Sequence, residues 1–186
     1  RSHCDWSSDV CSSDLGELPL SGVRVLDLTT IVFGPYTAQI LGDLGADVIK
    51  IEAPMGDPMR SIGPARNKGM SSIFLGSNRN KRSLVLNLKT DTARDALWRL
   101  IETSDMFVHN VRPQKIAALG FDPDAVLGRN PKIIYGGLHG YREAGPYGGR
   151  PAYDEIGRAS GRERVEIWVD AVSLKKKNEG RQKDGS

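Results

Sequence analysis

The chain has 186 residues, with 26 Lys and Arg against 23 Asp and Glu, which gives a net charge of +3. A balance this mild, with cations scattered along the chain, does not favour a nucleic-acid-binding or membrane-binding surface, although it suits an anionic small molecule. No apolar run approaches the roughly 18 residues of a membrane span, so we expect a cytoplasmic protein without nucleic-acid or membrane partners.

The two ends of the chain differ from its middle. Residues Asp5–Leu15, "DWSSDVCSSDL", back-translate into a widely used short-read sequencing adapter, and Glu155–Val165, "EIGRASGRERV", back-translate into its partner with one departing base. Non-native segments have to be excluded before the fold is considered. We therefore expect residues 1–15 and 155–186 to be adapter-derived; the alternative is that both ends are genuine polar tails.

The interpretable protein is then residues 16–154, a length that suits one ordinary domain. Its 17 Lys and Arg minus its 14 Asp and Glu again give +3. Both cysteines, Cys4 and Cys11, lie outside it, so cysteine spacing predicts neither a disulfide nor a metal site.

The first half of this segment predicts two strands, a helix and a long loop. Val23–Thr29, "VRVLDLT", is a short aliphatic run typical of a buried strand, and "GPYTAQILGDLGA" after it has apolar residues at helical spacing. Asp47–Glu52, "DVIKIE", predicts the second strand. Ala53–Asn80 is rich in Gly, Pro, Ser and Asn and predicts a loop.

The second half repeats the alternation. Strands are predicted at Arg82–Lys89, Asp105–Val111 and Lys132–Gly140, and "TDTARDALWRLIETS" between the first two predicts a capped helix. Two short helical segments, "RPQKIAALG" and "DPDAVLGRNP", precede the last strand. Such alternation favours right-handed crossovers, so we expect an α/β protein with a Rossmann-like, mostly parallel sheet and helices on both faces.

Ligands of such sheets bind beyond the carboxyl ends of the strands. The first strand exit lacks G-x-G-x-x-G, which disfavours a dinucleotide oxidoreductase. Gly34 and Pro35 are interpreted equally as a helix start or as a close approach to a ligand. "NRNKRS" at 78–83 is either a phosphate contact or a charged edge that protects a strand. Asn110 and Arg112 lie at the exit of a predicted strand, and we favour them as ligand contacts.

Other reaction classes find little support in the residues. His139 has no Ser or Cys at a spacing typical of a nucleophilic triad, and we expect it in a loop with a local hydrogen bond. No G-x-S-x-G, Walker loop, H-E-x-x-H or paired metal ligands occur. The residues alone thus predict an α/β enzyme fragment that binds an anionic ligand and no metal.

A resemblance sharpens this prediction. Five segments occur in order: "LPLSGVRVLDLT", "GPYTAQILGDLGADVIKIEAPMGDPMR", "NRNKRSLVLNLKT", "HNVRPQKIAALGF" and "GPYGGRPAYD". Together they resemble the N-terminal part of the class III CoA-transferases, the CaiB/BaiF group. The resemblance covers essentially all of residues 16–154.

The resemblance implies a partial large domain of a fold in which two subunits interlock as a homodimer. It implies transfer of coenzyme A from an acyl-CoA to a carboxylic acid through an aspartyl-acyl anhydride and an enzyme-CoA thioester. The CoA thioester is a substrate, and no cofactor is expected. The nucleophilic aspartate of the family falls beyond the "AYD" stretch, within 155–186, so no catalytic residue is expected in 16–154.

Residues that contact coenzyme A in the family are carried over to matching positions. They lie in four segments, at strand exits or in the terminal loop: Val32, Phe33, Leu86, Asn87, Leu88, Lys89, Asn110, Val111, Arg112, Pro151, Ala152, Tyr153 and Asp154. Ala53 and Ala118 stand where the family has arginines, and Pro151 where it has a lysine. The hypothesised substitutes are three nearby arginines: Arg60, Arg112 and Arg150.

Three alternatives remain open. The α-methylacyl-CoA racemase branch of the family has a histidine in "GHD" where this chain has Tyr153, which fits a transferase better than a general-base enzyme. The second alternative is a non-catalytic module that binds CoA or a nucleotide. The third is a read product that cannot fold, because its apolar strand edges are exposed.

Overall fold

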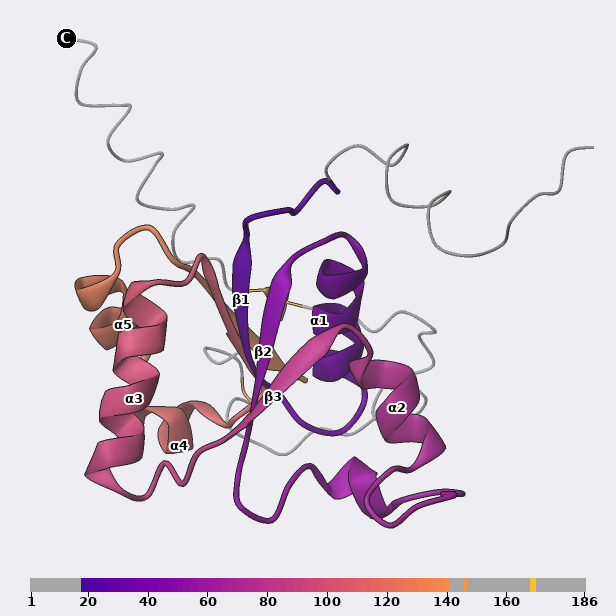
Figure 1. The fold of residues 1–186 in the computed structure, drawn as a ribbon. Helices are drawn as coiled ribbons and strands as arrows, with labels where there is room; N and C mark the ends of the chain where they lie inside the picture. Colours follow the sequence, from indigo (N-terminus) through magenta and orange to yellow (C-terminus); the bar gives the residue numbers. More distant parts are fainter. Residues whose placement is uncertain (1–17, 141–145, 147–167, 170–186) are drawn as a thin grey trace, which may run out of the picture.

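A computed structural model describes residues 18–140, 146 and 168–169. Its sheet has the strand order β3-β2-β1-β4-β5-β6, in which β1 to β5 are parallel and β6 pairs antiparallel with β5 (Figure 1). The strands are β1 Arg24–Leu28, β2 Asp47–Glu52, β3 Lys81–Val85, β4 Met106–His109, β5 Ile134–His139 and β6 Trp168–Val169. The predicted Rossmann-like, mostly parallel sheet is confirmed.

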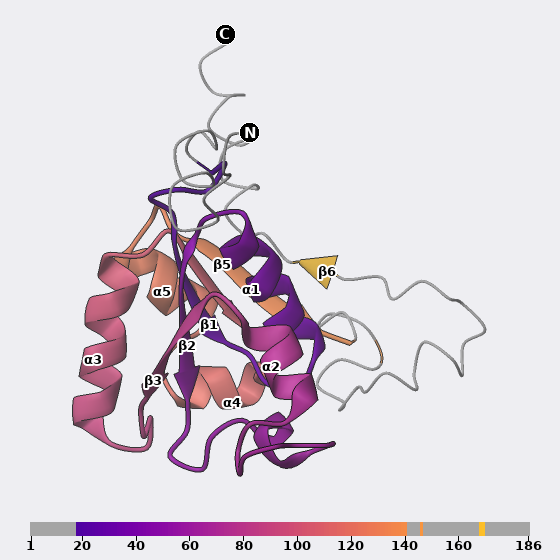
Figure 2. The ribbon, with the colours of Figure 1, turned by 45° about the vertical axis from the view of Figure 1, so that its right-hand side comes forward.

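Helices cover both faces of this sheet, as Figures 1 and 2 show. On one face lie α1, Phe33–Asp43, and α2, Ser72–Asn78. On the other lie α3, Asp91–Glu102, α4, Pro113–Ala118, and α5, Pro123–Arg129. A short 3-10 helix, η1, spans Pro58–Ser61. From β1 to β4, the chain leaves each strand at its carboxyl end, at the bottom of Figure 1, and returns through helical segments to the start of the next strand.

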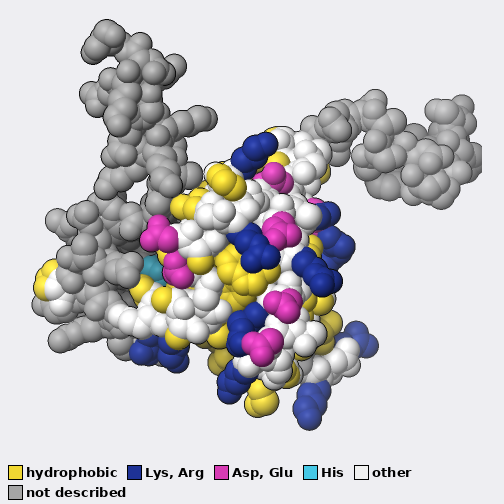
Figure 3. Space-filling view, turned by 90° about the vertical axis from the view of Figure 1, so that its left-hand side faces the viewer, with side chains coloured by type: hydrophobic (Ala, Val, Ile, Leu, Met, Phe, Trp, Pro, Cys, Tyr) yellow, Lys and Arg dark blue, Asp and Glu magenta, His cyan; other side chains and the backbone are white. Residues whose placement is uncertain are grey.

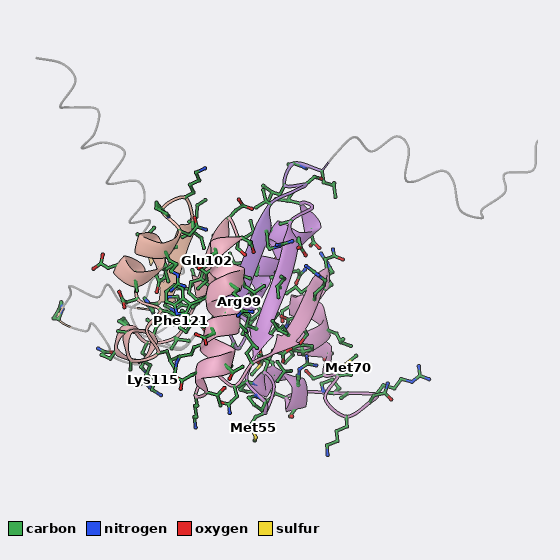
Figure 4. All side chains as sticks on the ribbon, turned by 60° about the vertical axis from the view of Figure 1, so that its left-hand side comes forward. Met55, Met70, Arg99, Glu102, Lys115 and Phe121 are labelled. Carbon is green, nitrogen blue, oxygen red and sulfur yellow. The ribbon has the colours of Figure 1, made fainter. Side chains whose placement is uncertain are left out.

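The face under α3, α4 and α5 carries the larger apolar core. Phe107 and Leu26 of the strands are fully buried there against Leu97 and Ile101 of α3. Phe121 lies beside α3 near α4 (Figure 4), and its ring centroid is 4.8 Å from that of Trp98. This face supplies the apolar burial that drives folding.

The face under α1 has a smaller apolar core and a layer of buried charge. Val25, Val48 and Val108 pack against Ala38 of α1. Side chains alternate along a strand, so the residue two positions after a core valine points to the same face. Two positions after Val25 and Val48 stand Asp27 and Lys50, which are 0% and 1% exposed. Charged groups are therefore buried between α1 and the sheet.

The predicted loop over 53–80 is wrong in part, because it contains η1 and α2. Ser71 caps α2: its hydroxyl oxygen accepts from the backbone N–H of Phe74 at 3.1 Å, and the Phe74 side chain is buried. The Ser71 cap was the signal available in the sequence. The third strand is also shorter than predicted, since the chain turns at Asn87, whose carbonyl accepts from the N–H of Thr90 at 2.9 Å.

The two-residue strand β6 was not predicted. It pairs through Val169 with Leu138 and through Trp168 with His139. It lies within 155–186, the segment whose adapter origin stays a prediction.

The surface has no dominant charge of one sign on the face that carries α3 and α5. Figure 3 shows basic and acidic side chains interspersed there. Among the described residues, no helix is long and apolar enough to cross a membrane.

Candidate functional site

The strand order reverses at β1. The chain continues from β1 to β2 and β3 on one side, whereas β4 and β5 extend the sheet on the other. In open α/β sheets, ligands bind beyond the carboxyl ends of the strands at such a reversal. The candidate site is therefore the edge of the sheet between loop 29–35, which comprises the residues after β1 and the first three residues of α1, and the segment after β4, residues 110–112.

One side chain joins these two segments. The Asn110 side-chain Oδ1 accepts from the backbone N–H of Thr30 at 3.1 Å, and its Nδ2 donates to the Thr30 carbonyl at 2.8 Å. Both polar ends of the amide thus bind the backbone of the neighbouring strand exit. Asn110 thus holds loop 29–35 near its start.

The residue after this contact has an unusual backbone conformation. Ile31 has φ +76°, in the left-handed region that β-branched residues rarely adopt. Such a conformation costs on the order of 1–3 kcal/mol and persists only where its surroundings enforce it. Neighbouring contacts therefore have to hold this loop.

Thr29, at the start of the loop, is fully buried and bonded through all its polar groups. Its backbone N–H donates to Asp27 Oδ1 at 3.0 Å, and its hydroxyl donates to the same oxygen. Its carbonyl accepts from Lys50 Nζ at 2.9 Å. The Lys50 ammonium in turn lies 3.0 Å from Asp57 Oδ2.

Lys81 holds the far end of the loop. Its Nζ donates to the carbonyl of Pro35 at 2.6 Å, to Asp27 Oδ2 at 2.9 Å and to Asn78 Oδ1 at 2.9 Å. Burial lowers the pKa of Lys81, against the opposing effect of the Asp27 carboxylate. The loop is thus held at both ends by buried ammonium groups.

A second buried carboxylate lies after Lys50 on β2. Glu52 accepts from Arg60 at 2.7 and 2.6 Å, from the Ser83 hydroxyl at 2.6 Å and from the Asp57 N–H at 3.0 Å. Burial acts to raise the pKa of Glu52, but these donors outweigh it and lower the pKa to about 2. Arg60 also stacks 3.8 Å over the Phe74 ring. Its guanidinium therefore has a structural role, which weakens its case as a substitute CoA-binding arginine.

Two histidines meet at the ends of β4 and β5. The rings of His109 and His139 are 5.5 Å apart, and His109 is 1% exposed beside Tyr135. Neither ring nitrogen of His109 has a well-aligned hydrogen bond within the described part of the chain, although the Val111 backbone weakly favours the charged form. Burial first, and His139 second, lower the pKa of His109 to about 4. His109 is a neutral imidazole at pH 7, and His139 belongs to β5 rather than to a loop.

The cations of "NRNKRS" prove to be structural. Arg79 pairs with Asp43 at 2.6 Å and Arg82 with Asp47 at 2.6 Å, while Lys81 is buried. The phosphate-contact interpretation therefore gives way to that of a charged, ion-paired strand edge. Within residues 18–140, no group of three or more His, Cys, Asp and Glu side chains could hold a metal ion.

The family model described as CoA-transferase family III matches residues 20–162. The chain belongs to this family. The match includes every element from β1 to β5 and both segments of the candidate site.

The names of proteins similar to this chain are consistent with CoA-transferase family III. The chain is 43% identical over 141 residues to a probable fatty acyl-CoA transferase of Mycobacterium tuberculosis, covering 74% of this chain and 36% of that protein. It is 42% identical to the mouse succinyl-CoA:glutarate CoA-transferase, over 76% of this chain and 33% of that one. It is 40% identical to a formyl-CoA:oxalate CoA-transferase of Streptomyces avermitilis, over 76% of this chain and 34% of that protein.

Solved structures show the same fold. A crystal structure of the mycobacterial protein matches with a TM-score of 0.72 and 38% identity, over 82% of this chain and 43% of that one. A CaiB/BaiF family protein from Brucella suis matches with a TM-score of 0.75 and 35% identity, over 78% of this chain and 40% of that one. The chain spans about a third of the length of the curated relatives it matches.

The structure brings three of the four segments expected to contact CoA to one edge of the sheet. Val32 occupies the N-cap position of α1 and Phe33 begins the helix, and the two residues are 38% and 37% exposed. Segment 86–89 follows the edge strand β3, two strands away from β1. There Leu86 and Leu88 pack partly into the larger core, whereas Asn87 and Lys89 are exposed.

The three residues of the segment after β4 have different roles. Asn110 binds the Thr30 backbone, Val111 packs against the larger core, and Arg112 is exposed at the start of α4. The fourth segment, Pro151–Asp154, lies outside the described residues, as does Arg150. The proposed contacts that are exposed at this edge are Val32, Phe33, Asn87, Lys89 and Arg112.

Sequence reasoning missed the buried residues that support the site. Asp27, Lys50 and Lys81 are charged residues within or beside apolar strands, and that mismatch was the signal available. A charge inside a buried strand needs a partner, so each of them implied an opposite charge nearby.

Gly34 tests how tightly the loop packs. A Cβ added there would lie 2.5 Å from Thr29 Cβ, so we expect Gly34→Ala to destabilise the protein by about 1–3 kcal/mol, as overpacking does. Helix propensity alone would give the opposite sign, since alanine favours a helix over glycine by about 1 kcal/mol. The matched control is Gly76→Ala in α2, where a Cβ meets nothing within 4 Å and should stabilise. Urea denaturation measures the free energy of unfolding of both variants. Stability changes of the same sign in the two variants would contradict the packing argument.

Proposed function

We propose that residues 16–154 are the N-terminal part of a CoA-transferase and bind coenzyme A at the carboxyl ends of β1 and β4. The intact enzyme would move coenzyme A from an acyl-CoA to a carboxylic acid, as a cytoplasmic homodimer with no cofactor beyond the CoA thioester. The observation that carries the proposal is the Asn110 bridge to Thr30, which couples two family segments at the strand-order reversal.

The exposed groups suit this ligand. Coenzyme A combines an adenine ring with phosphates. An exposed aromatic ring such as that of Phe33 can stack on a purine, and a guanidinium such as that of Arg112 binds phosphate with charge-assisted hydrogen bonds. These residues follow neighbouring strands, whose backbones lie about 4.8 Å apart. Adenine and phosphate contacts can therefore come from adjacent strand exits.

Calorimetric titration of the 186-residue chain with coenzyme A tests the binding step. We expect Arg112→Met to weaken coenzyme A binding about tenfold, because a hydrogen bond to a charged group contributes about 1.5–3 kcal/mol. The matched control is Lys132→Met, which removes one exposed cation next to β5 at the opposite edge of the sheet. Equal affinities for the two variants would contradict an Arg112 contact. No heat of binding for the unaltered chain would argue against the site.

The transfer activity needs a nucleophile, which we place outside residues 16–154. We expect the 186-residue chain to be inactive with succinyl-CoA and glutarate or with formyl-CoA and oxalate, the pairs named for its relatives. Resequencing the source DNA across the Asp154 codon tests the boundary. A reading frame that continues to the family aspartate supports the proposal, and assay of its product tests transfer. Adapter-encoded text in the genomic DNA would contradict the boundary.

A further inference from the structure

Two buried lysines share one arrangement beneath loop 29–35. Lys50 of β2 lies 3.0 Å from an Asp57 oxygen and donates to a carbonyl at the start of the loop. Lys81 of β3 lies 2.9 Å from an Asp27 oxygen and donates to a carbonyl at its far end. Both lysine side chains are 2% exposed and both carboxylates are 0% exposed. Each ammonium thus neutralises one carboxylate and binds one loop carbonyl.

Stability alone is a poor reason for this arrangement. A buried ion pair is often matched or exceeded in stability by apolar residues of similar volume, because both charges lose their hydration. An apolar pair has no donor to offer a backbone carbonyl, whereas an ammonium has three. Lys81 directs one donor to the loop, and the other two to Asp27 and Asn78. What the lysines of the ion pairs add is a hydrogen bond from each ammonium to a backbone carbonyl of loop 29–35.

We propose that Lys50 and Lys81 are positioning residues for ligand binding. By holding the carbonyls at both ends of loop 29–35, they keep Ile31 in its left-handed conformation. Val32 and Phe33, which follow Ile31, are expected coenzyme A contacts, so their placement depends on that conformation. The ligand in this inference rests on the proposed function, whereas the effect on the loop does not.

The double variant Lys50→Met, Asp57→Asn tests the proposal while leaving no unpaired buried charge. Asp57 Oδ1 also accepts from the N–H of Met59 at 2.9 Å, as the cap of η1, and an asparagine oxygen preserves that bond. The change therefore removes the ion pair and the bond to the Thr29 carbonyl. Arg82→Met removes an exposed cation that pairs with Asp47 and has no loop contact.

Amide hydrogen exchange of the full chain gives a readout that does not depend on any ligand. In the double variant we expect the Thr30 amide to exchange at least about tenfold faster, with amides of β4 and β5 unchanged, because local opening is separate from global unfolding. Arg82→Met should leave the exchange of the Thr30 amide unchanged. Faster exchange in loop and strands together would indicate a general structural role and overturn the proposal. Unchanged exchange at Thr30 would also overturn it.

Titration with coenzyme A completes the test. We expect the double variant to bind coenzyme A about tenfold more weakly, and Arg82→Met to bind it like the unaltered chain. Faster loop exchange with unchanged affinity would overturn the link between the lysines and the ligand. If the unaltered chain binds no coenzyme A, the proposed function fails, and the exchange result still decides whether the lysines position the loop.

Discussion

Lys81→Met is expected to lower the free energy of unfolding by about 3–5 kcal/mol, because it leaves the Asp27 carboxylate buried without its counter-ion. The Asp27 side chain is 0% exposed, so water cannot replace the ammonium unless the structure opens. The carbonyl of Pro35 loses its donor as well. Urea denaturation monitored by circular dichroism measures the loss.

A neutral double variant separates charge from packing. Asp27→Asn combined with Lys81→Met removes both charges, while the asparagine oxygen still accepts from the Thr29 N–H. We expect most of the stability lost in Lys81→Met to return, as a large coupling energy between the two positions. A loss below about 1 kcal/mol in Lys81→Met would mean that the carboxylate is hydrated in the folded state.

Stability is expected to fall by about 2 kcal/mol between pH 7 and pH 5, owing to His109. Its pKa is about 4 in the folded chain and 6.5 as an ordinary histidine, so the unfolded chain takes up the proton first. The contribution is fully present above pH 6.5 and declines as the pH falls towards 4. Glu52, with its pKa lowered to about 2, loses its contribution only below its ordinary value of 4.5. Glu52 therefore does not contribute to the decline between pH 7 and pH 5.

The control for this prediction is His109→Phe. The phenyl ring keeps the contacts with Phe107 and Tyr135 but cannot be protonated. Denaturation at pH 7, 6 and 5 should show a flatter pH dependence in the variant, with His139 still present in both proteins. An identical slope in the two proteins would assign the pH dependence to another group.

The sequence was most informative where hydrophobic pattern decides structure. Asp47–Glu52 was predicted with the bounds observed for β2, and the helix predicted in "TDTARDALWRLIETS" is α3. Both have strong periodicity that local residues alone produce. α2 escaped prediction because its seven residues include a glycine and two serines, and its stability comes from burying Phe74. Tertiary packing outweighs weak propensity there.

For the candidate site, the hydrophobic pattern of the sequence located the strand exits but did not predict the roles of the side chains there. Asn110 was predicted as a ligand contact, and the structure shows both ends of its amide on Thr30, which only the strand order brings near. Arg60 was a hypothesised ligand arginine and instead binds Glu52. A polar residue at a strand exit can serve the ligand or the loop, and which one it serves depends on partners distant in sequence.

The central place of β1 has a consequence for synthesis on the ribosome. β2 and β3 can join β1 as soon as they emerge, but the other edge of β1 pairs with β4, and Val25 lies opposite Met106. Twenty residues, 86–105, lie between the end of β3 and the start of β4. At about 5–20 residues per second, the free edge of β1 therefore stays open for roughly 1–4 s after β1, β2 and β3 have emerged. During that interval the nascent chain carries an unpaired edge that chaperones or neighbouring chains can bind.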